Sequence, residues 1–401
     1  MKKLLLILLV LAAIVAAAAI YLRATTPAKS RGVSFPLPAN DHDILAHVPA
    51  TAEAFALVPN AAALEATLRA NEVTRDAVDA WSAKQRLPRP WMIGNADLLA
   101  WRSEGRTRYY LRLDPVRAFV VRTYTMIAGG GDTILINAPA EAAIAPEELQ
   151  RIETLAAKLP AGDALVVQRM SGRGAFPPIA RPAVSSIGVT PAAIRIVSRA
   201  ASDDPPSSAL SASFPKSAVL AAAFVEPPRI VDDLNRLLGV KVAALLGGGG
   251  ALALYDVELG KLLPRPLGVI AVPAERRAAF NDVVDLAKQG QSLGYEVRTA
   301  ERGGQMLLSF DRSLDLYLKD AFDPRQFPTA RWAVHADAAR LVPILRQLSD
   351  NLGLRIASPR IFRGARDADH WIEALGRANS IEAVDSTDGS AEQLSVDIAT
   401  K

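Results

Sequence analysis

The chain has 401 residues, of which 50% are hydrophobic and 22% charged, and it contains no cysteine. The lack of cysteine excludes disulfides, cysteine-ligated zinc, iron–sulfur clusters and a cysteine nucleophile, and the length accommodates about two or three domains. The formal net charge is only +4, and Lys2, Lys3 and Arg23 near the N-terminus carry most of it. Nucleic-acid binding normally requires a clustered basic excess, so we expect no nucleic-acid partner.

An uninterrupted apolar run, residues 4–22, follows Met1-Lys2-Lys3. A helix over this run is roughly 28 Å long, which matches the hydrocarbon thickness of a bilayer. Residues 1–23 are therefore predicted to be a transmembrane anchor. A cleaved signal segment ending near Ala17-Ala18-Ala19 is the alternative, and both forms export the rest of the chain. The two lysines favour an N-terminus inside, which predicts a single-pass protein of the inner (cytoplasmic) membrane with a periplasmic body.

Residues 24–48 are rich in proline and polar residues, and they follow neither a helical nor a strand pattern. Proline favours extended chain, so we expect a tether here. The segment contains the metal-like group Asp41-His42-Asp43, with His47 nearby. Oxygen and imidazole ligands suit hard or borderline metals, but no second ligand cluster accompanies them. We expect a solvated polar segment here, and for the protein neither a metal nor a cofactor.

The rest of the chain contains one pattern of elements twice. Each copy begins with a strand led by a proline and continues into an amphipathic helix, with Leu64 and Leu68 on the apolar face in the first copy. A glycine-led strand, a strand ending in proline, a helix and further strands follow in the same order. The matched segments, first copy before second, are 49–59 with 215–225, 93–101 with 246–255, 109–115 with 267–273, 115–128 with 273–289, 132–137 with 305–310, 159–169 with 327–337, and 186–197 with 380–398.

These matches predict an α+β protein made of two tandem related copies of a β-α-β-β-α-β unit with antiparallel sheets, behind one N-terminal transmembrane helix. The copies are expected at 49–200 and 214–401, with a polar, proline-rich linker at 201–213. The alternative is that any α+β chain produces loose echoes of this order. Asp114 is a predicted N-cap before Pro115, and hairpin turns are predicted at Thr190-Pro191 and Asp388-Gly389. Additional helices are expected in the second copy at 337–350 and 367–378.

The same features carry a family resemblance: a proline-led strand, a helix with leucine at helical spacing, a glycine-led strand and a second hairpin, all behind one N-terminal anchor. This order resembles a bacterial family of exported, single-pass membrane-anchored domains of unknown function. The resemblance covers most of residues 49–401 and lies in the pattern of elements. It implies an envelope location and a repeated α+β fold, and it implies no activity and no catalytic residues.

The most distinctive candidate site is an alternation of arginines along one predicted strand. Arg106, Arg108, Tyr110 and Arg112 are expected to share one face of that strand. Guanidinium groups bind phosphates and carboxylates through paired hydrogen bonds. This candidate binding face therefore suits lipid phosphates or an acidic partner, and a solvated face in an arginine-rich protein is the alternative.

No motif for a serine hydrolase or a phosphate-binding loop is present in the sequence. The prediction is a non-enzymatic binding or scaffold module of the cell envelope whose partner is an envelope protein or a lipid. The alternatives are an exported hydrolase with an unrecognised site and a subunit of an envelope transport or secretion complex. Weaker candidates, for which a structural or solvated role is the simpler interpretation, are His335, His370, Asp203-Asp204, Asp232-Asp233, Gly129–Gly131, Gly247–Gly250, and the group Arg355, Arg360, Arg363 and Arg366.

Overall fold

A computed structural model describes most of the chain after the predicted anchor. The described residues are 32–76, 78–79, 88, 90–128, 133–139, 144–169, 182–225, 245–246, 249–259, 264–289, 296–350 and 372–400. The predicted anchor and residues 24–31 of the predicted tether lie outside them, as does the helix predicted to follow Val225. Within the described ranges, no helix is both long and apolar enough to cross a membrane. The chain divides into two compact units, Met1–Ala201 (unit 1) and Ser202–Lys401 (unit 2).

Unit 1 is built on a mainly antiparallel sheet with the strand order β7-β6-β5-β1-β2-β3-β4. Only the pair β3–β4 is parallel among the described pairings, because α6 carries the chain back between these two strands. Its strands are β1 (Ala54–Val58), β2 (Leu98–Ser103), β3 (Arg106–Leu111), β4 (Ile134–Ile136), β5 (Ala164–Gln168), β6 (Ala183–Thr190) and β7 (Ala193–Ala201). Its helices are α2 (Ala39–Leu45), α3 (Ala61–Ala70), α5 (Pro90–Ile93), α6 (Pro115–Ala128) and α7 (Pro146–Ala156).

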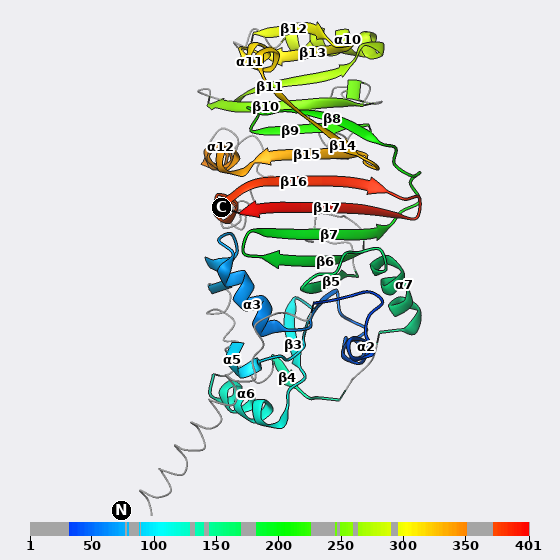
Figure 1. The fold of residues 1–401 in the computed structure, drawn as a ribbon, viewed down its shortest axis with the longest axis vertical. Helices are drawn as coiled ribbons and strands as arrows, with labels where there is room; N and C mark the ends of the chain where they lie inside the picture. The colour runs from blue at the N-terminus through cyan, green and yellow to red at the C-terminus, as the bar shows by residue number, and fades with distance from the viewer. Residues whose placement is uncertain are drawn as a thin grey trace, which may run out of the picture. The chain divides into compact units, whose positions relative to one another are not determined.

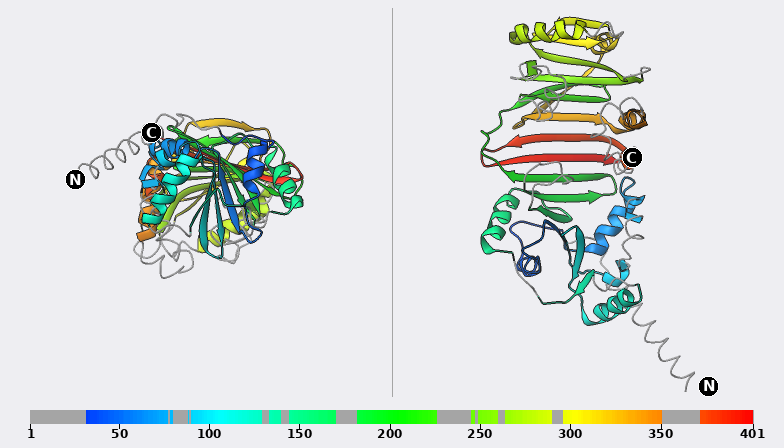
Figure 2. Two further views of the ribbon diagram at one scale, coloured as in Figure 1. Left: turned by 90° about the horizontal axis from the view of Figure 1, so that it is seen from below. Right: turned by 180° about the vertical axis from the view of Figure 1, so that it is seen from behind.

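Alternating side chains of this sheet enter two different cores. Leu57, Leu99 and Tyr110 pack with residues of α2 and α7 on one face. Tyr109 and Leu111 point to the other face and pack with residues of α5 and α6. The sheet of unit 1 therefore has helices on both faces, and α7 and α3 lie on different sides of its strands (Figures 1 and 2).

The predicted tether is wrong from Val33 onward. Val33 is fully buried and bridges to Gly162, and the helix α2 places Ile44 and Leu45 in the core. Ile44 and Leu45 lie in α2 and the buried Val48 follows one turn later, a spacing that the flanking prolines obscure in the sequence. Residues 33–48 are therefore part of the folded unit.

Unit 2 has an antiparallel sheet with the strand order β12-β13-β11-β10-β9-β15-β16-β17, and β14 pairs with β8 as a separate two-stranded ribbon. Its strands are β8 (Leu210–Pro215), β9 (Leu220–Phe224), β10 (Gly250–Leu259), β11 (Pro264–Pro273), β12 (Val297–Arg302), β13 (Gln305–Phe310), β14 (Phe322–Phe327), β15 (Trp332–Asp337), β16 (Ala378–Thr387) and β17 (Ala391–Thr400). Its helical segments are η1 (Ala274–Arg276), α10 (Arg277–Gln289), α11 (Ser313–Lys319) and α12 (Ala338–Asp350).

The two faces of this sheet are also covered differently. Small residues such as Ala223 and Ala253 let the β8–β14 ribbon pack closely on one face, where Phe214 is buried. On the other face, Phe280 and Val284 of α10 pack with Phe224 and its neighbours. Figure 1 shows β14 crossing the sheet strands obliquely and α10 lying beside β12 and β13.

Several predicted elements are confirmed. The fold is α+β with antiparallel sheets, a helix covers Pro115–Ala128, and both predicted hairpin turns join paired strands. The Asp114 carboxylate caps α6 by accepting hydrogen bonds from the amides of Val116 and Arg117, both at 3.0 Å. The predicted linker 201–213 ends in strand β8, because alternating Leu210 and Ala212 are buried. The strand β12, which pairs with β13, is absent from the prediction.

Candidate functional site

The predicted arginine strand is β3, and a tight hairpin joins it to β2. Glu104 and Gly105 at the turn have φ of 52° and 73°, the two left-handed conformations that a type I′ turn requires. The resulting register places Trp101 opposite Arg108 and Ser103 opposite Arg106. Directly opposite residues of an antiparallel pair share one face. The two arginines therefore stand on the same face as Trp101.

A cavity of about 220 Å³ lies on this face, and we call it the arginine pocket. Its floor includes Trp101 and Tyr110, each only 4% exposed. The residues that line it are His47, Pro49, Thr51, Trp101, Ser103, Glu104, Arg106, Arg108, Tyr110, Leu135, Ala138 and Pro139. The pocket thus combines an aromatic floor, hydroxyl groups and two guanidinium groups.

The side chains of Arg106 and Arg108 are exposed, and neither guanidinium group forms an ion pair or hydrogen bond with any residue in the described part of the chain. By contrast, the neighbouring Arg102 has its Nε 3.8 Å from Glu53 Oε2. Glu104, at the tip of the hairpin, is the acidic residue that lines the pocket beside them. Two unpaired guanidinium groups on one face form a site whose preferred ligand is an anion.

His47 closes the side of the pocket next to Tyr110. The two rings stack with centroids 4.0 Å apart and an interplanar angle of 17°. Burial, and secondarily the charge of Arg112, lower the pKa of His47, so its imidazole is neutral at pH 7. Burial raises the pKa of Tyr110, which keeps its hydroxyl protonated. The positive charge of the pocket therefore comes from the two arginines.

The fourth residue of the predicted binding face, Arg112, is not part of the pocket lining. It follows the last residue of β3, and its Nη2 lies 3.3 Å from the carbonyl oxygen of Asn40 and 3.5 Å from Asp97 Oδ2. The structure thus brings three of the four predicted residues together at one cavity. The guanidinium of Arg112 instead contacts Asn40 and Asp97, which do not line that cavity.

One wall of the pocket is held in place by an arginine outside it. Arg169, just after β5, pairs with Glu148 of α7 through two hydrogen bonds of 2.6 Å each. Its Nη1 donates to the carbonyl oxygens of Ala50 and Ala52 at 2.8 Å and 2.9 Å. These carbonyls flank Thr51, which lines the pocket. Arg169 therefore fixes the segment before β1 relative to α7.

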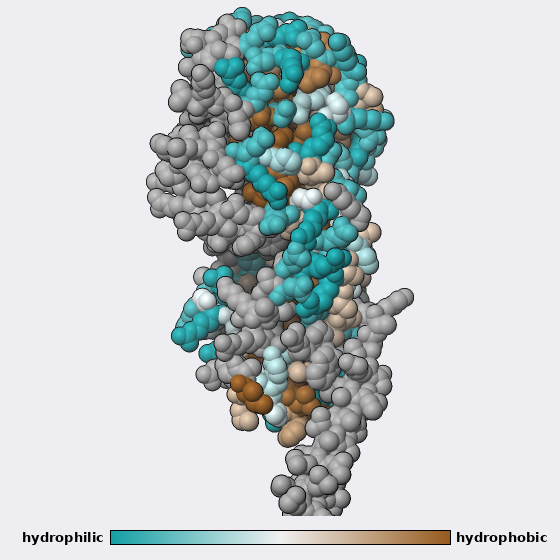
Figure 3. All heavy atoms as spheres, turned by 90° about the vertical axis from the view of Figure 1, so that its left-hand side faces the viewer, coloured by the Kyte–Doolittle hydropathy of each residue, from teal (hydrophilic) through white to brown (hydrophobic). Residues whose placement is uncertain are grey.

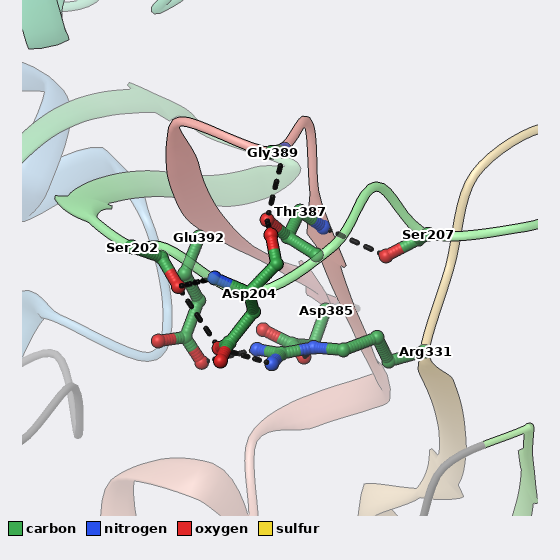
Figure 4. A network of polar contacts seen from close by, with 8 residues as sticks. All are labelled: Ser202, Asp204, Ser207, Arg331, Asp385, Thr387, Gly389 and Glu392. Atoms are coloured by element: carbon green, nitrogen blue, oxygen red, sulfur yellow. Dashed lines mark hydrogen bonds and ion pairs between the residues drawn. The ribbon is translucent and has the colours of Figure 1, made fainter.

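A second polar cluster lies within unit 2, around Arg331, and nothing in the sequence pattern predicts it (Figure 4). Its guanidinium lies between three carboxylates: Asp385 at 2.7 Å, Asp204 at 3.1 Å, and Glu392. Burial raises the pKa of Asp385 to about 6, and the nearby Glu392 carboxylate acts in the same direction, despite the opposing effect of Arg331. Because three carboxylates share a single guanidinium cation, the Asp385 carboxyl holds its proton more tightly than an isolated aspartate does.

The cluster around Arg331 continues into a backbone network. The Thr387 amide donates to Ser207 Oγ at 2.8 Å, and the Gly389 amide donates to Thr387 Oγ1 at 3.2 Å (Figure 4). These contacts join residues 202–208 to β15, β16 and β17. The arrangement explains how the start of unit 2 is held against its own sheet, and we assign it a structural role.

Unit 2 also has a larger cavity, of about 390 Å³, lined by polar and apolar residues of β8, β9, β10 and β13 and of neighbouring segments. Its arginine, Arg302, is already engaged. The guanidinium carbon lies 5.4 Å from the centroid of the Phe322 ring, and Nη1 donates to the carbonyl oxygen of Leu318 at 3.2 Å. This cavity therefore lacks the unpaired charge of the arginine pocket.

The other predicted candidates are separated or lie outside the described residues. His42 Nε2 lies 2.8 Å from Glu153 Oε1, and Asp41 is buried. The described ranges contain no group of three or more His, Cys, Asp or Glu side chains placed to hold a metal ion. His335 packs near Phe214, with Nδ1 3.2 Å from Glu382 Oε1. Outside the described residues lie His370, Asp232-Asp233, Gly129–Gly131, Gly247-Gly248, and Arg355, Arg360, Arg363 and Arg366.

The sequence pattern predicts Arg106, Arg108 and Tyr110 of the pocket, but it does not predict Trp101 and His47. His47 lies in the segment predicted as a tether, although its spacing from Ile44 and Leu45 fits the end of a helix. The Glu104-Gly105 turn was the available signal for placing Trp101 opposite Arg108. Comparisons with protein-family models, with curated proteins and with solved structures find no match to this chain.

Proposed function

We propose that this protein is a non-enzymatic binding module that captures an acidic group in the arginine pocket. The observation that carries the proposal is the pair Arg106 and Arg108, which have no partner among the described residues and stand beside a buried aromatic floor. A purely solvated arginine face does not require Trp101 and Tyr110 to line a cavity. Charge-assisted hydrogen bonds to a phosphate or carboxylate would satisfy both guanidinium groups.

The volume of the pocket limits the size of the ligand. Cavities that enclose a drug-sized molecule have volumes of about 300–1,000 Å³, whereas the arginine pocket measures about 220 Å³. We therefore propose that it receives a small acidic group with a flat or apolar substituent. Such a group belongs to the headgroup region of an envelope lipid or to a side chain of an envelope protein.

The second unit lacks these residues, which supports a specialised role for the first. Pro115, the first residue of α6, and Pro273, the residue before η1, align β3 with β11. The pocket residues and their counterparts in this alignment are Arg106 and Pro264, Arg108 and Pro266, and Tyr110 and Gly268. A feature needed only for the stability of the repeated fold would be expected in both units.

We also propose that the two units arose by tandem duplication. The strand order supports this: β7-β6-β5-β1-β2-β3 in unit 1 has the same sequence of connections as β17-β16-β15-β9-β10-β11 in unit 2. The units differ beyond these strands. In unit 1, β4 is parallel to β3, whereas in unit 2 β13 is antiparallel to β11 and β12 lies outside it.

The apolar run at residues 4–22 supports the proposal that the chain is held by one N-terminal segment in the inner membrane, with both units in the periplasm. A binding module with this topology works beside the bilayer. Its acidic ligand is then a component of the envelope, either a lipid or a membrane-associated protein.

The experiment is calorimetric titration of the full-length chain, in a neutral maltoside detergent, with phenyl phosphate and with benzoate. Binding is expected for the unchanged chain and for Arg102→Gln, a control on the opposite face of the same hairpin. The double variant Arg106→Gln and Arg108→Gln is expected to bind at least about tenfold more weakly, since each charge-assisted hydrogen bond contributes about 1–2 kcal/mol. Preference for phenyl phosphate favours a lipid phosphate as ligand, and preference for benzoate favours an acidic side chain. Equal affinities of the double variant and the control contradict the proposal.

A further inference from the structure

Helix α6 exposes an apolar face that no described part of unit 1 covers. Phe119 is 73% exposed, Met126 76% and Ile127 79%, and Val116 is 43% exposed. These values are high for large apolar side chains, and all four residues belong to one helix of fourteen residues. In Figure 3, hydrophobic atoms reach the surface at the height that α6 occupies in Figure 1.

The exposed residues form a continuous stripe. At ~100° per residue, Val116, Phe119, Met126 and Ile127 fall within ~120° of the helix circumference, with the half-buried Thr123 among them. The opposite side of the helix, with Ala118, Val121 and Thr125 buried, packs on the sheet. Helix α6 is therefore apolar on both sides, and the second side has no partner within the described part of unit 1.

The edges of the stripe suit the interface between a bilayer and water. Helix α6 contains Arg117 and Arg122 and no acidic residue. The Asp114 carboxylate pairs with the buried Arg117 at 2.8 Å. Arg122 is exposed at one edge of the stripe, where its Nη2 donates to the carbonyl oxygen of Ile136 at 3.1 Å and its other guanidinium nitrogens form no hydrogen bond within the described residues. Tyr124 lies toward the other edge and is half-buried. Arginine and tyrosine beside an apolar face are typical of helices that lie in the headgroup region.

The length of chain before the folded body keeps unit 1 close to a membrane. Leu22 ends the apolar run, and Gly32 is the first residue that the structure describes. The link between them reaches at most about 35 Å when fully extended. A surface tethered at that distance has a high effective concentration at the bilayer, so even a weakly binding apolar stripe is expected to remain engaged.

We propose that the exposed stripe of α6 docks on the surface of the membrane that anchors the chain. Phe119, Met126 and Ile127 then lie among the acyl chains near the headgroups, and Arg122 contacts lipid phosphates. This inference rests on the proposed anchor and goes beyond the proposed ligand site, because the stripe is a separate surface. Docking holds unit 1 in one orientation relative to the bilayer instead of letting it rotate on its tether.

The chain has no native cysteine, so single labels are introduced without background. Full-length Phe119→Cys and Met126→Cys are labelled with an environment-sensitive fluorophore and reconstituted, one chain per nanodisc, in phosphatidylcholine with phosphatidylglycerol. Thr154→Cys, at an exposed position of α7, is the control. Quenching by doxyl-labelled lipid is compared with quenching by aqueous iodide. The stripe labels are expected to be quenched several-fold more by lipid, and less by iodide, than the control label.

A second variant set keeps the result interpretable. Replacing the exposed Phe119 and Ile127 by serine is expected to return the label at position 126 to water while the circular dichroism spectrum is unchanged. If the chain floats with vesicles but the stripe labels match the control, the anchor stands and the docking proposal is overturned. Labels shielded from iodide but not quenched by lipid indicate a protein contact and also overturn it. Failure of the full chain to float with vesicles overturns both the anchor and the docking.

Discussion

Replacing Arg169 by alanine tests whether the wall of the arginine pocket depends on one clamp. The side chain is 15% exposed, and it joins the Glu148 carboxylate of α7 to the carbonyl oxygens of Ala50 and Ala52. Without it, the carboxylate, which is 20% exposed, and two carbonyl groups lose their donors. The substitution is therefore expected to lower the stability of unit 1 and to change the shape of the pocket.

The magnitude follows from the contacts that are lost. Two hydrogen bonds to carbonyl oxygens contribute about 1 kcal/mol each. The bidentate ion pair contributes about 1–2 kcal/mol once its partial exposure to solvent is discounted. Arg169→Ala is thus expected to lower the free energy of unfolding of unit 1 by about 3–4 kcal/mol. Binding of phenyl phosphate is expected to weaken as well, because Pro49 and Thr51 line the pocket.

The assay is urea unfolding followed by hydrogen–deuterium exchange and mass spectrometry, which reports on peptides of unit 1 and unit 2 separately. Arg151→Ala is the matched control, because Arg151 is 54% exposed and lies 3.8 Å from the same Glu148 carboxylate. It is expected to change stability by less than about 0.5 kcal/mol. Equal effects of the two substitutions would refute the assignment of Arg169 as the clamp.

Three further predictions concern stability. Folding raises the pKa of Asp385 from 3.8 to about 6, so the folded chain binds a proton that the unfolded chain has already released. The free energy of unfolding of unit 2 is therefore expected to fall by up to about 3 kcal/mol as pH rises from about 4 through 6. Urea titrations across this range should show the decrease, and Asp385→Asn should flatten it. Gly94→Ala, whose methyl group collides with the guanidinium of Arg117, should cost about 2 kcal/mol more than Gly105→Ala, which also has positive φ but meets no atom within 4 Å; matching denaturation curves for the two would exclude the steric effect. Asn60→Ala removes the side-chain cap of α3 and should cost about 1 kcal/mol in thermal unfolding, whereas Asn60→Asp should retain most of it.

Local sequence signals predicted those elements whose boundaries are encoded locally. Asp114 followed by Pro115 marks the start of α6, and the structure places the cap there. The turns after Thr190 and at Asp388-Gly389 join strands whose alternation is visible in the sequence. Arg106 and Arg108 share a face because side chains alternate along any strand, so this part of the site followed from the spacing.

The remainder of the site depends on contacts between distant residues. Trp101 joins Arg108 only through the register of the β2–β3 hairpin, and His47 reaches Tyr110 only once α2 packs on the sheet. Asp204, Arg331 and Asp385 are far apart in the sequence, and none carries a local pattern that predicts their pairing. The tether is mispredicted for the same reason, because the burial of the apolar side chains in residues 33–48 depends on contacts with distant parts of the chain.

The most direct test of the central claim is arginine modification resolved by residue. The full-length chain is treated with phenylglyoxal, with and without phenyl phosphate, and its arginine-containing peptides are quantified by mass spectrometry. If the arginine pocket binds an acidic group, Arg106 and Arg108 react readily in the free chain and are protected by the ligand, while the reaction of Arg102 is unchanged. Unaltered modification of Arg106 and Arg108 at saturating phenyl phosphate would contradict the account.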